Sequence, residues 1–141
     1  MDTLFDLRPE RPGYRLQRLE LYNWGTFDSR SDEVHVVRPD GRTSLLVGQN
    51  GSGKSTLVDA ILTLLVPRRI RNYNVAAGAQ KTERDEGSYI RGACGQTGDD
   101  STGSKTQYLR GDSRSSYSAL LAVFRDEALG ESFTVCQVLY L

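Results

Sequence analysis

The feature that most constrains this chain is a glycine-rich segment that fits the pattern G-x-x-x-x-G-K-[ST] over residues 48–55. Glycines let the backbone curl so that successive N–H groups point at one anion. Residues 44–47 before the segment form a short apolar run of the kind typical of a buried parallel strand. Residues 55–66 after it carry apolar side chains at helical spacing. The strand–loop–helix order predicts a phosphate-binding P-loop rather than a chance match.

Each position of this loop has an expected role at a nucleotide. Lys54 would place its ammonium group on the β- and γ-phosphates, and the Ser55 hydroxyl would be a ligand of Mg²⁺. The helix that starts after Gly53 would turn its positive dipole end toward the same phosphates. We therefore predict ATP and Mg²⁺ as cofactors, although the loop reads phosphates and leaves adenine and guanine open. The predicted nucleotide-binding residues are Gly48, Gln49, Asn50, Gly51, Ser52, Gly53, Lys54, Ser55 and Thr56.

Other motifs narrow the class of P-loop protein. Residues 100–103 fit the D-x-x-G of GTPases, but no strand-like run precedes them, and no N-K-x-D for guanine follows. A small-molecule kinase usually begins at its P-loop strand, whereas here two strand-like runs come first. Hydrolysis needs a second acidic group on the metal. Asp126 and Glu127 follow an apolar run, but the hairpin pattern around them predicts a solvated turn. The chain is therefore expected to bind nucleotide without a recognisable apparatus to hydrolyse it alone.

The remaining segments predict an α/β fold with an antiparallel β portion. Residues 1–15 are charged and proline-containing, and we expect a flexible arm. Pro67 ends the predicted helix, and a polar, glycine-rich stretch covers residues 68–115, within which residues 88–92 are expected to be ordered. Alternating patterns predict strands at residues 16–24, 33–37, 117–124 and 132–140, the last two joined as a hairpin.

Bulk composition excludes few functions. The length of 141 residues suits one domain, and the 18 basic and 18 acidic residues give a formal net charge of zero. Charge alone therefore does not indicate a nucleic acid or an anionic membrane. Cys94 and Cys136 are expected to be free thiols, with a disulfide left open, and His35 belongs to a strand pattern. Because no signal peptide or membrane-spanning run is present in the sequence, we expect a cytoplasmic protein without membrane contact.

The chain resembles the SMC/RecF/Rad50 class of ATPase heads. The resemblance lies in the segment Leu21-Tyr22-Asn23-Trp24-Gly25-Thr26-Phe27, a return strand, the loop at residues 43–56 and the Leu57-Val58-Asp59-Ala60 that follows it. It implies that residues 16–141 are the N-terminal half of an ABC-type, SMC-like head, truncated at Leu141. It also implies that the C-terminal half supplies the signature and Walker B motifs, and that two heads dimerise around ATP.

A narrower resemblance is to the MukB-like ATPase subunits (the JetC family) of bacterial Wadjet anti-plasmid systems. It rests on residues 23–27, on Leu62-Thr63-Leu64-Leu65-Val66-Pro67, on Arg71-Asn72-Tyr73-Asn74 and on residues 133–141. It implies ATP-gated DNA handling in plasmid defence or chromosome maintenance, with further subunits as partners. The Q-loop glutamine of such heads stays unplaced between Gln107 and Gln137.

DNA contact is part of the same implication. The basic residues that could provide it are Arg68, Arg69, Arg71, Lys81, Arg84 and Arg91. Cations after a helix C-terminus also favour its dipole, so a purely solvated role is an alternative. Trp24 and Tyr22 fit packing better than base stacking. Two other functions stay open: a self-contained small ATPase or kinase, and a non-catalytic module in which ATP orders an interface.

Overall fold

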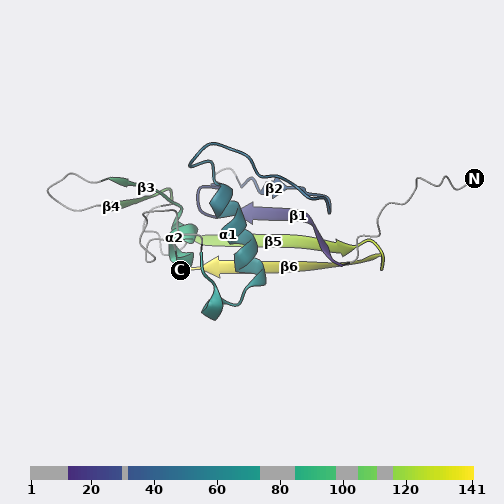
Figure 1. Cartoon of the computed structure of the whole chain (residues 1–141). Helices are drawn as coiled ribbons and strands as arrows, with labels where there is room; N and C mark the ends of the chain where they lie inside the picture. The colour runs from purple at the N-terminus through teal and green to yellow at the C-terminus, as the bar shows by residue number, and fades with distance from the viewer. Residues whose placement is uncertain (1–12, 30–31, 74–84, 98–104, 111–115) are drawn as a thin grey trace, which may run out of the picture.

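The computed structural model describes residues 13–29, 32–73, 85–97, 105–110 and 116–141. One long helix, α1, lies across a four-stranded sheet of order β2-β1-β5-β6 in which every neighbouring pair is antiparallel (Figure 1). The elements of this body are β1 (Arg15–Tyr22), β2 (His35–Val37), α1 (Lys54–Leu65), β5 (Tyr117–Asp126) and β6 (Glu131–Tyr140). A smaller part holds η1 (Arg68–Ile70), α2 (Glu86–Arg91), β3 (Ala93–Thr97) and β4 (Lys105–Tyr108).

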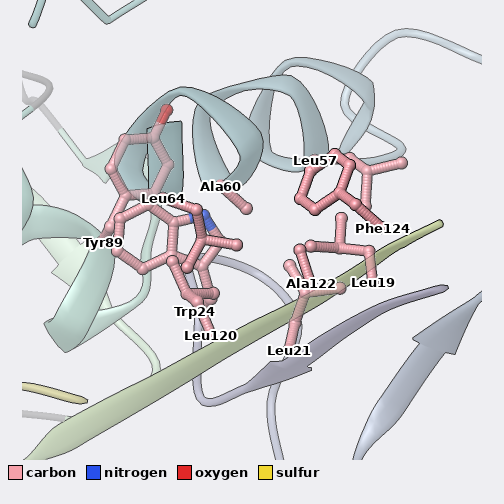
Figure 2. Packing of buried hydrophobic residues seen from close by; sticks show 10 residues of the cluster. All are labelled: Leu19, Leu21, Trp24, Leu57, Ala60, Leu64, Tyr89, Leu120, Ala122 and Phe124. Atoms are coloured by element: carbon pink, nitrogen blue, oxygen red, sulfur yellow. The ribbon is translucent and has the colours of Figure 1, made fainter. Parts of the chain in front are cut away.

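The core forms between α1 and one face of the sheet. Alternate residues of β5 point toward the helix, so that Leu120 is 0% exposed while Tyr117 on the opposite face is 46% exposed. The helix contributes three residues spaced at i, i+3 and i+7, because these positions share one face of an α-helix. Figure 2 shows the resulting cluster of Leu19, Leu21, Trp24, Leu57, Ala60, Leu64, Tyr89, Leu120, Ala122 and Phe124.

Most of the predicted regular elements are confirmed. The helix predicted at residues 55–66 is observed at Lys54–Leu65, and the chain turns extended at Val66 before Pro67. The predicted hairpin is the β5–β6 pair, with Asp126 opposite Glu131. The strand predicted at residues 33–37 is shorter than expected, since only His35–Val37 pairs with β1.

The prediction of a buried parallel strand at residues 44–47 is wrong for the described chain. These residues have no strand assignment, and Leu45 and Val47 are 88% and 79% exposed. A strand needs a neighbour to satisfy its backbone groups. The four strands beside α1 are already paired with one another, and none of them reaches this segment. The apolar run therefore lies exposed at the surface, directly before the P-loop.

The described parts of the polar stretch after α1 contain regular elements. Helix α2 begins with a capping box in which the Asp85 side chain accepts from the Ser88 amide, and it ends at Gly92 with a φ of 72°. The predicted ordered segment 88–92 lies in this helix and its cap. Strands β3 and β4 then form a two-stranded ribbon that projects from the body (Figure 1).

The end of the predicted arm packs on the sheet. Residues 1–12 lie outside the described residues, but the Gly13 amide donates to the Asp126 carboxylate over 3.1 Å. Tyr14 donates to Glu131 over 2.9 Å and packs against the Phe133 ring at 4.8 Å between centroids. Contacts with the β5–β6 hairpin thus hold this part of the chain. Within the described residues, no helix has the length and apolar character needed to span a bilayer.

Candidate phosphate-binding site

The loop between residues 48 and 53 has a backbone that depends on glycine. Gly51 and Gly53 have φ values of 83° and 88°, in the left-handed region that side chains disfavour. A Cβ atom at Gly48 would lie 2.6 Å from the Ser52 hydroxyl, so a side chain there would displace that hydroxyl. Residues 48–52 are exposed and residues 53–56 are half-buried. The predicted glycines therefore produce the curled, accessible loop that the motif requires.

The N-terminus of α1 has no internal compensation for its positive end. Its N-cap is Gly53, which offers no side-chain cap, and the first turn contains no acidic residue. The first N–H groups of an α-helix have no intrahelical partner. Most helices satisfy them with Ser, Thr, Asp or Asn at the N-cap. Here the amides of Lys54, Ser55 and Thr56 are left to an external acceptor, and the helix dipole favours an anion at this point.

Lys54 adds a full positive charge to the same loop. Its ammonium group donates to the carbonyl oxygens of Gly48 and Gln49 over 2.6 and 2.7 Å. The side chain is thus folded back over the loop rather than extended into solvent. An anionic acceptor adds Coulomb attraction between full charges, which a neutral carbonyl does not offer to the ammonium group. An anion in the loop would therefore draw this ammonium group away from the two carbonyls.

Residues 24–28, here called the backing segment, support the loop from behind. The Trp24 indole donates to the Thr56 carbonyl over 3.0 Å, and Trp24 itself is fully buried. A Cβ atom at Gly53 would lie 3.2 Å from the Phe27 ring. A Cβ at Gly25 would lie 2.5 Å from the Thr56 methyl group. Trp24 is core packing, as predicted, but its contact with the P-loop was not anticipated.

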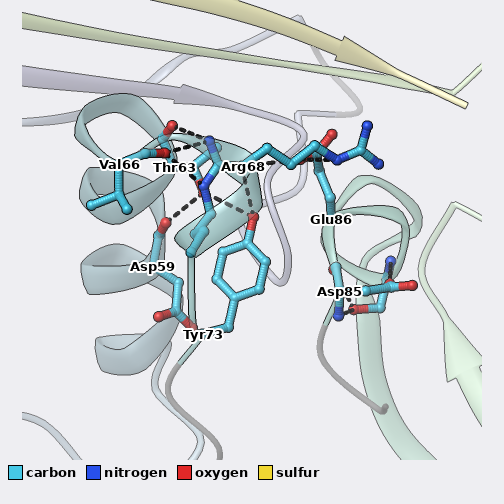
Figure 3. Close-up of polar contacts among 9 residues, drawn as sticks. Asp59, Thr63, Val66, Arg68, Tyr73, Asp85 and Glu86 are labelled. Atoms are coloured by element: carbon cyan, nitrogen blue, oxygen red, sulfur yellow. Dashed lines mark hydrogen bonds and ion pairs between the residues drawn. The ribbon is translucent and has the colours of Figure 1, made fainter. Parts of the chain in front are cut away.

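Among the described basic residues proposed for DNA contact, Arg71 does not present its charge at the surface. Arg71 is buried: its guanidinium donates to the carbonyls of Thr63 and Val66 at the end of α1 and pairs with Glu86 at 3.0 Å. Figure 3 shows Glu86 together with Thr63 and Tyr73 around these contacts. Arg69 is exposed, and the Arg68 side chain is 82% exposed. Arg91 lies over the Tyr108 ring at 5.6 Å, while Lys81 and Arg84 lie outside the described residues.

The candidate second acid, Asp126, does not lie at the P-loop. The two candidate Q-loop glutamines, Gln107 and Gln137, do not lie there either. Asp126 is 5% exposed, so the prediction of a solvated side chain is wrong for it. Its carboxylate accepts from the amides of Ala128 and Leu129, which fixes the hairpin turn. Gln137 lines a pocket of about 400 Å³ at the C-terminal end of α1, opposite to the P-loop end. Gln107 is exposed on β4.

The side chains of His35, Cys94 and Cys136 are of types that can bind a metal ion. His35 Nε2 lies 2.9 Å from the Asp28 carbonyl oxygen, which suits a strand residue that ties down a neighbouring turn. Cys94 and Cys136 are free, as predicted, and both are exposed. In the described part of the chain no cluster of three or more His, Cys, Asp or Glu side chains could hold a metal ion.

Comparison with known proteins agrees with this geometry. Residues 16–80 match the family model described as the P-loop containing region of AAA domain. Two chromosome partition proteins MukB, from Vibrio vulnificus strains YJ016 and CMCP6, are 36% identical over 87 residues, or 57% of this chain and 5% of each relative. The DNA double-strand break repair Rad50 ATPase of Pyrococcus abyssi is 46% identical over 48 residues, 34% of this chain and 5% of its own length. No solved structure matches the chain significantly.

These matches support the coarser prediction. The chain contains a P-loop NTPase region, and its similarity to MukB and Rad50 supports the N-terminal part of an SMC-like ATPase. The chain spans about 5% of the length of these curated relatives. The matched family region, residues 16–80, includes the backing segment, the P-loop and α1.

Proposed function

We propose that this chain is the ATP-binding half of an SMC-like, DNA-handling ATPase head. The observation that carries the proposal is the uncapped N-terminus of α1 beneath a curled glycine loop, with the Lys54 ammonium group inside it. The loop offers amides, a dipole end and one mobile cation, and it presents no acidic side chain in the first turn of α1. This set suits the β- and γ-phosphates of a nucleotide.

The residues divide the work at the phosphates. The amides of residues 51–56 donate hydrogen bonds to the phosphate oxygens, and Lys54 leaves its two carbonyl partners for the β- and γ-phosphates. The Ser55 hydroxyl would hold Mg²⁺, which neutralises charge between these phosphates. The similarity to a Rad50 ATPase favours ATP over GTP. The backing segment keeps the first turn of α1 in place while the loop adjusts.

The partners follow from what the chain exposes. Leu45 and Val47 form an apolar strip before the P-loop, and Val58 and Leu65 on the outer side of α1 are 44% and 51% exposed. We propose that the C-terminal half of the head covers these residues, pairs with residues 44–47 and supplies the missing acids. A second head would then close on the nucleotide, and the resulting dimer would act on DNA.

The biological process is the finest level of the proposal. MukB relatives are chromosome partition proteins, and the Rad50 relative is a DNA double-strand break repair protein. The segments that resemble JetC-type subunits suit plasmid defence within a Wadjet system, and the MukB similarity suits chromosome maintenance, so the proposal includes both processes. Asp126 is held by the hairpin turn, which disfavours a self-contained ATPase or kinase.

Nucleotide binding and phosphate release by the purified chain test the proposal. We expect the chain to bind Mg·ATP and to release no phosphate. Lys54→Ala should weaken binding by about 10- to 100-fold, because a charge-assisted hydrogen bond contributes about 1.5–3 kcal/mol. Arg69→Ala removes an exposed cation beyond the other end of α1 and should leave binding unchanged. Phosphate release that depends on Lys54 would overturn the half-head proposal, and equal binding by Lys54→Ala would overturn the site.

A Ser55→Ala variant separates the metal from the nucleotide. It removes the hydroxyl and keeps the amide, so binding without Mg²⁺ should be the same as in the unmodified chain. The gain in affinity on adding Mg²⁺ should be reduced, because one oxygen ligand is lost. A full Mg²⁺ effect in Ser55→Ala would remove this residue from the site.

A further inference from the structure

The backing segment is itself held by a part of the chain that lies more than 60 residues away in sequence. Tyr89 of α2 stacks on Trp24, with ring centroids 4.5 Å apart and planes at 14°. Its carbonyl accepts from the Gly25 amide over 2.8 Å. Its hydroxyl donates to the Asp59 carboxylate in the middle of α1. Tyr89 therefore contacts both the helix that follows the P-loop and the segment that supports it.

Asp59 and Tyr89 are deep in the core, at 0% and 6% exposure. Burial of a carboxylate is unfavourable unless it is hydrogen-bonded, so an apolar pair would fill this space at a lower cost. A buried polar pair of this kind specifies one relative position of two elements rather than maximal stability. Here the two elements are α1 and α2. In the position that the pair specifies, Trp24 lies under Thr56 and donates to its carbonyl.

Arg110, just after β4, fixes the other side of the backing segment. Its Nη2 donates to the carbonyls of Gly25 and Tyr89, each over 2.9 Å, and its Nη1 lies 3.2 Å from the Asp28 carboxylate. Its side chain is 9% exposed. The contact requires a glycine at position 92, because a Cβ there would lie 2.8 Å from the Arg110 guanidinium and 2.9 Å from the Gly25 carbonyl oxygen.

The same residue closes the base of the β3–β4 ribbon. The Arg110 amide donates to the Arg91 carbonyl and the Leu109 amide to the Gly92 carbonyl, each over 3.0 Å. Opening this base would release the Arg110 guanidinium from Gly25 and Asp28. The ribbon, α2 and the backing segment are therefore joined by one set of bonds that ends at the Thr56 carbonyl and at the Phe27 ring beneath Gly53.

We propose that Tyr89 and Arg110 are positioning residues for the P-loop, and that docking of the α2–β3–β4 unit is thermodynamically coupled to nucleotide binding. The proposal rests on the ATP-binding function proposed above. Neither residue touches the phosphates; both act through the backing segment on the first turn of α1. Coupling between two sites is reciprocal, so a docked unit that raises nucleotide affinity is itself stabilised by the nucleotide to the same extent.

Two variants and one matched control test the positioning role. Tyr89→Phe removes the hydroxyl that reaches Asp59 and keeps the stacking on Trp24. Arg110→Lys keeps the charge but cannot make the same set of bonds to Gly25 and Asp28. The control, Tyr73→Phe, removes a part-buried hydroxyl that contacts Thr63 and Arg71 at the C-terminal end of α1. The first two should weaken Mg·ATP binding by at least about fivefold, the lower end of typical coupling, and Tyr73→Phe should stay within about twofold of the unmodified chain.

Amide hydrogen exchange supplies a readout that simple loss of stability would not produce. In the unmodified chain, Mg·ATP should slow exchange of the Leu109 and Arg110 amides at least about fivefold, by the reciprocity of coupling. The nucleotide should have no such effect in Lys54→Ala or in Arg110→Lys. The comparison of the unmodified chain with Lys54→Ala tests the coupling even if Arg110→Lys proves unstable.

The outcomes separate the two proposals. Absence of Mg·ATP binding by the unmodified chain would overturn the proposed function itself. Binding with unchanged exchange at residues 109 and 110 would overturn only the coupling. Folded Tyr89→Phe and Arg110→Lys variants that both bind Mg·ATP as tightly as the unmodified chain would also overturn it.

Discussion

Two apolar runs of this chain have similar composition and opposite environments. Residues 119–124 of β5 lie between β1 and β6 and under α1, and Leu120 is fully buried. Residues 44–47 have no partner strand in the described chain, and Leu45 is 88% exposed. Hydrophobicity alone would treat the two runs alike. The difference teaches that burial of a strand depends on neighbours elsewhere in the sequence.

The two runs also differ in what lies beside them. β5 has its hairpin partner β6 only a few residues away, so one of its two ladders forms from local contacts. Residues 44–47 precede a loop and a helix, and a parallel partner for them would need a crossover connection. The structure thus has one complete layer on the inner side of α1 and an exposed apolar strip on its outer side. The predictions below test how far this contrast extends, beginning with the largest effect.

The first prediction compares the same substitution in the two runs. Leu120→Ala should lower the free energy of unfolding by about 3–5 kcal/mol, because it loses transfer energy and leaves a cavity. Leu45→Ala should change it by less than about 0.5 kcal/mol, as expected for an exposed site. Urea unfolding followed by the fluorescence of Trp24, the chain's single tryptophan, would measure both.

The contrast fails if the two variants are equally destabilised. A large effect of Leu45→Ala would mean that residues 44–47 are buried in solution, for example in a dimer of this chain. Sedimentation at two protein concentrations would then distinguish a dimer from a rearranged monomer. Val47→Ala, at 79% exposure, provides a second exposed position for the same comparison.

The sequence predicted the parts of the molecule that depend on local pattern. Three features follow from residues within a short window of sequence. They are the positive φ values at Gly51 and Gly53, the helix that ends before Pro67, and the β5–β6 hairpin. The assignment of nucleotide to residues 48–56 stays a prediction, but the curled loop and the uncapped helix fit it. Local chemistry was sufficient in these cases because each element satisfies its own backbone or pairs with its neighbour.

The contacts that the sequence did not predict are long-range. Tyr89 reaches Asp59 across 30 residues, and Arg110 reaches Asp28 across 82 residues. Neither pair has a spacing signal, since a tyrosine in a polar stretch and an arginine before Gly111 suggest nothing by themselves. The error at residues 44–47 has the same origin, because a parallel strand is defined by partners that no local pattern reveals.

The second prediction extends the contrast to a pair of arginines. Arg71→Gln removes a guanidinium that is 5% exposed and bonded to the end of α1 and to Glu86. It should cost about 2–3 kcal/mol, since charge-assisted hydrogen bonds are lost and Glu86 keeps a half-buried charge. Arg69→Gln, on the exposed side of the same turn, should cost less than about 0.5 kcal/mol.

Urea unfolding measures this pair, and DNA binding provides a separate readout. If the isolated chain binds DNA, Arg69→Gln should weaken that binding, whereas folded Arg71→Gln should leave it unchanged because its guanidinium faces inward. A folded Arg71→Gln variant with full stability would show that the α1–α2 bonds contribute nothing. Loss of DNA binding in that variant would mean that the Arg71 guanidinium is exposed in solution.

The smallest expected effect lies on the open face of the sheet. Hydrogen bonding with Tyr117, and then with Asp32, raises the pKa of Tyr22 from 10.0 to about 12. A group whose pKa is raised on folding contributes stability that is complete below pH 10 and is lost as the pH rises toward 12. At neutral pH this contribution is present but small, because the Tyr22 hydroxyl is exposed to solvent, so Tyr22→Phe should change stability little. Between pH 10 and 12 it should make stability less dependent on pH.

Phenolate absorbance would measure this shift directly. Subtracting the alkaline titration of Tyr22→Phe from that of the unmodified chain should give a midpoint near 12. Tyr117→Phe should move the Tyr22 midpoint back toward 10, because the hydrogen bond to Tyr117 is the largest cause of the shift. A midpoint at the ordinary value in the folded chain would mean that the Tyr22–Tyr117 pair does not persist on the open face. Among the residues described, side-chain order would then be limited to the face of the sheet that α1 covers. The covered and open faces would differ more than the stacking of the Tyr22 and Tyr117 rings indicates.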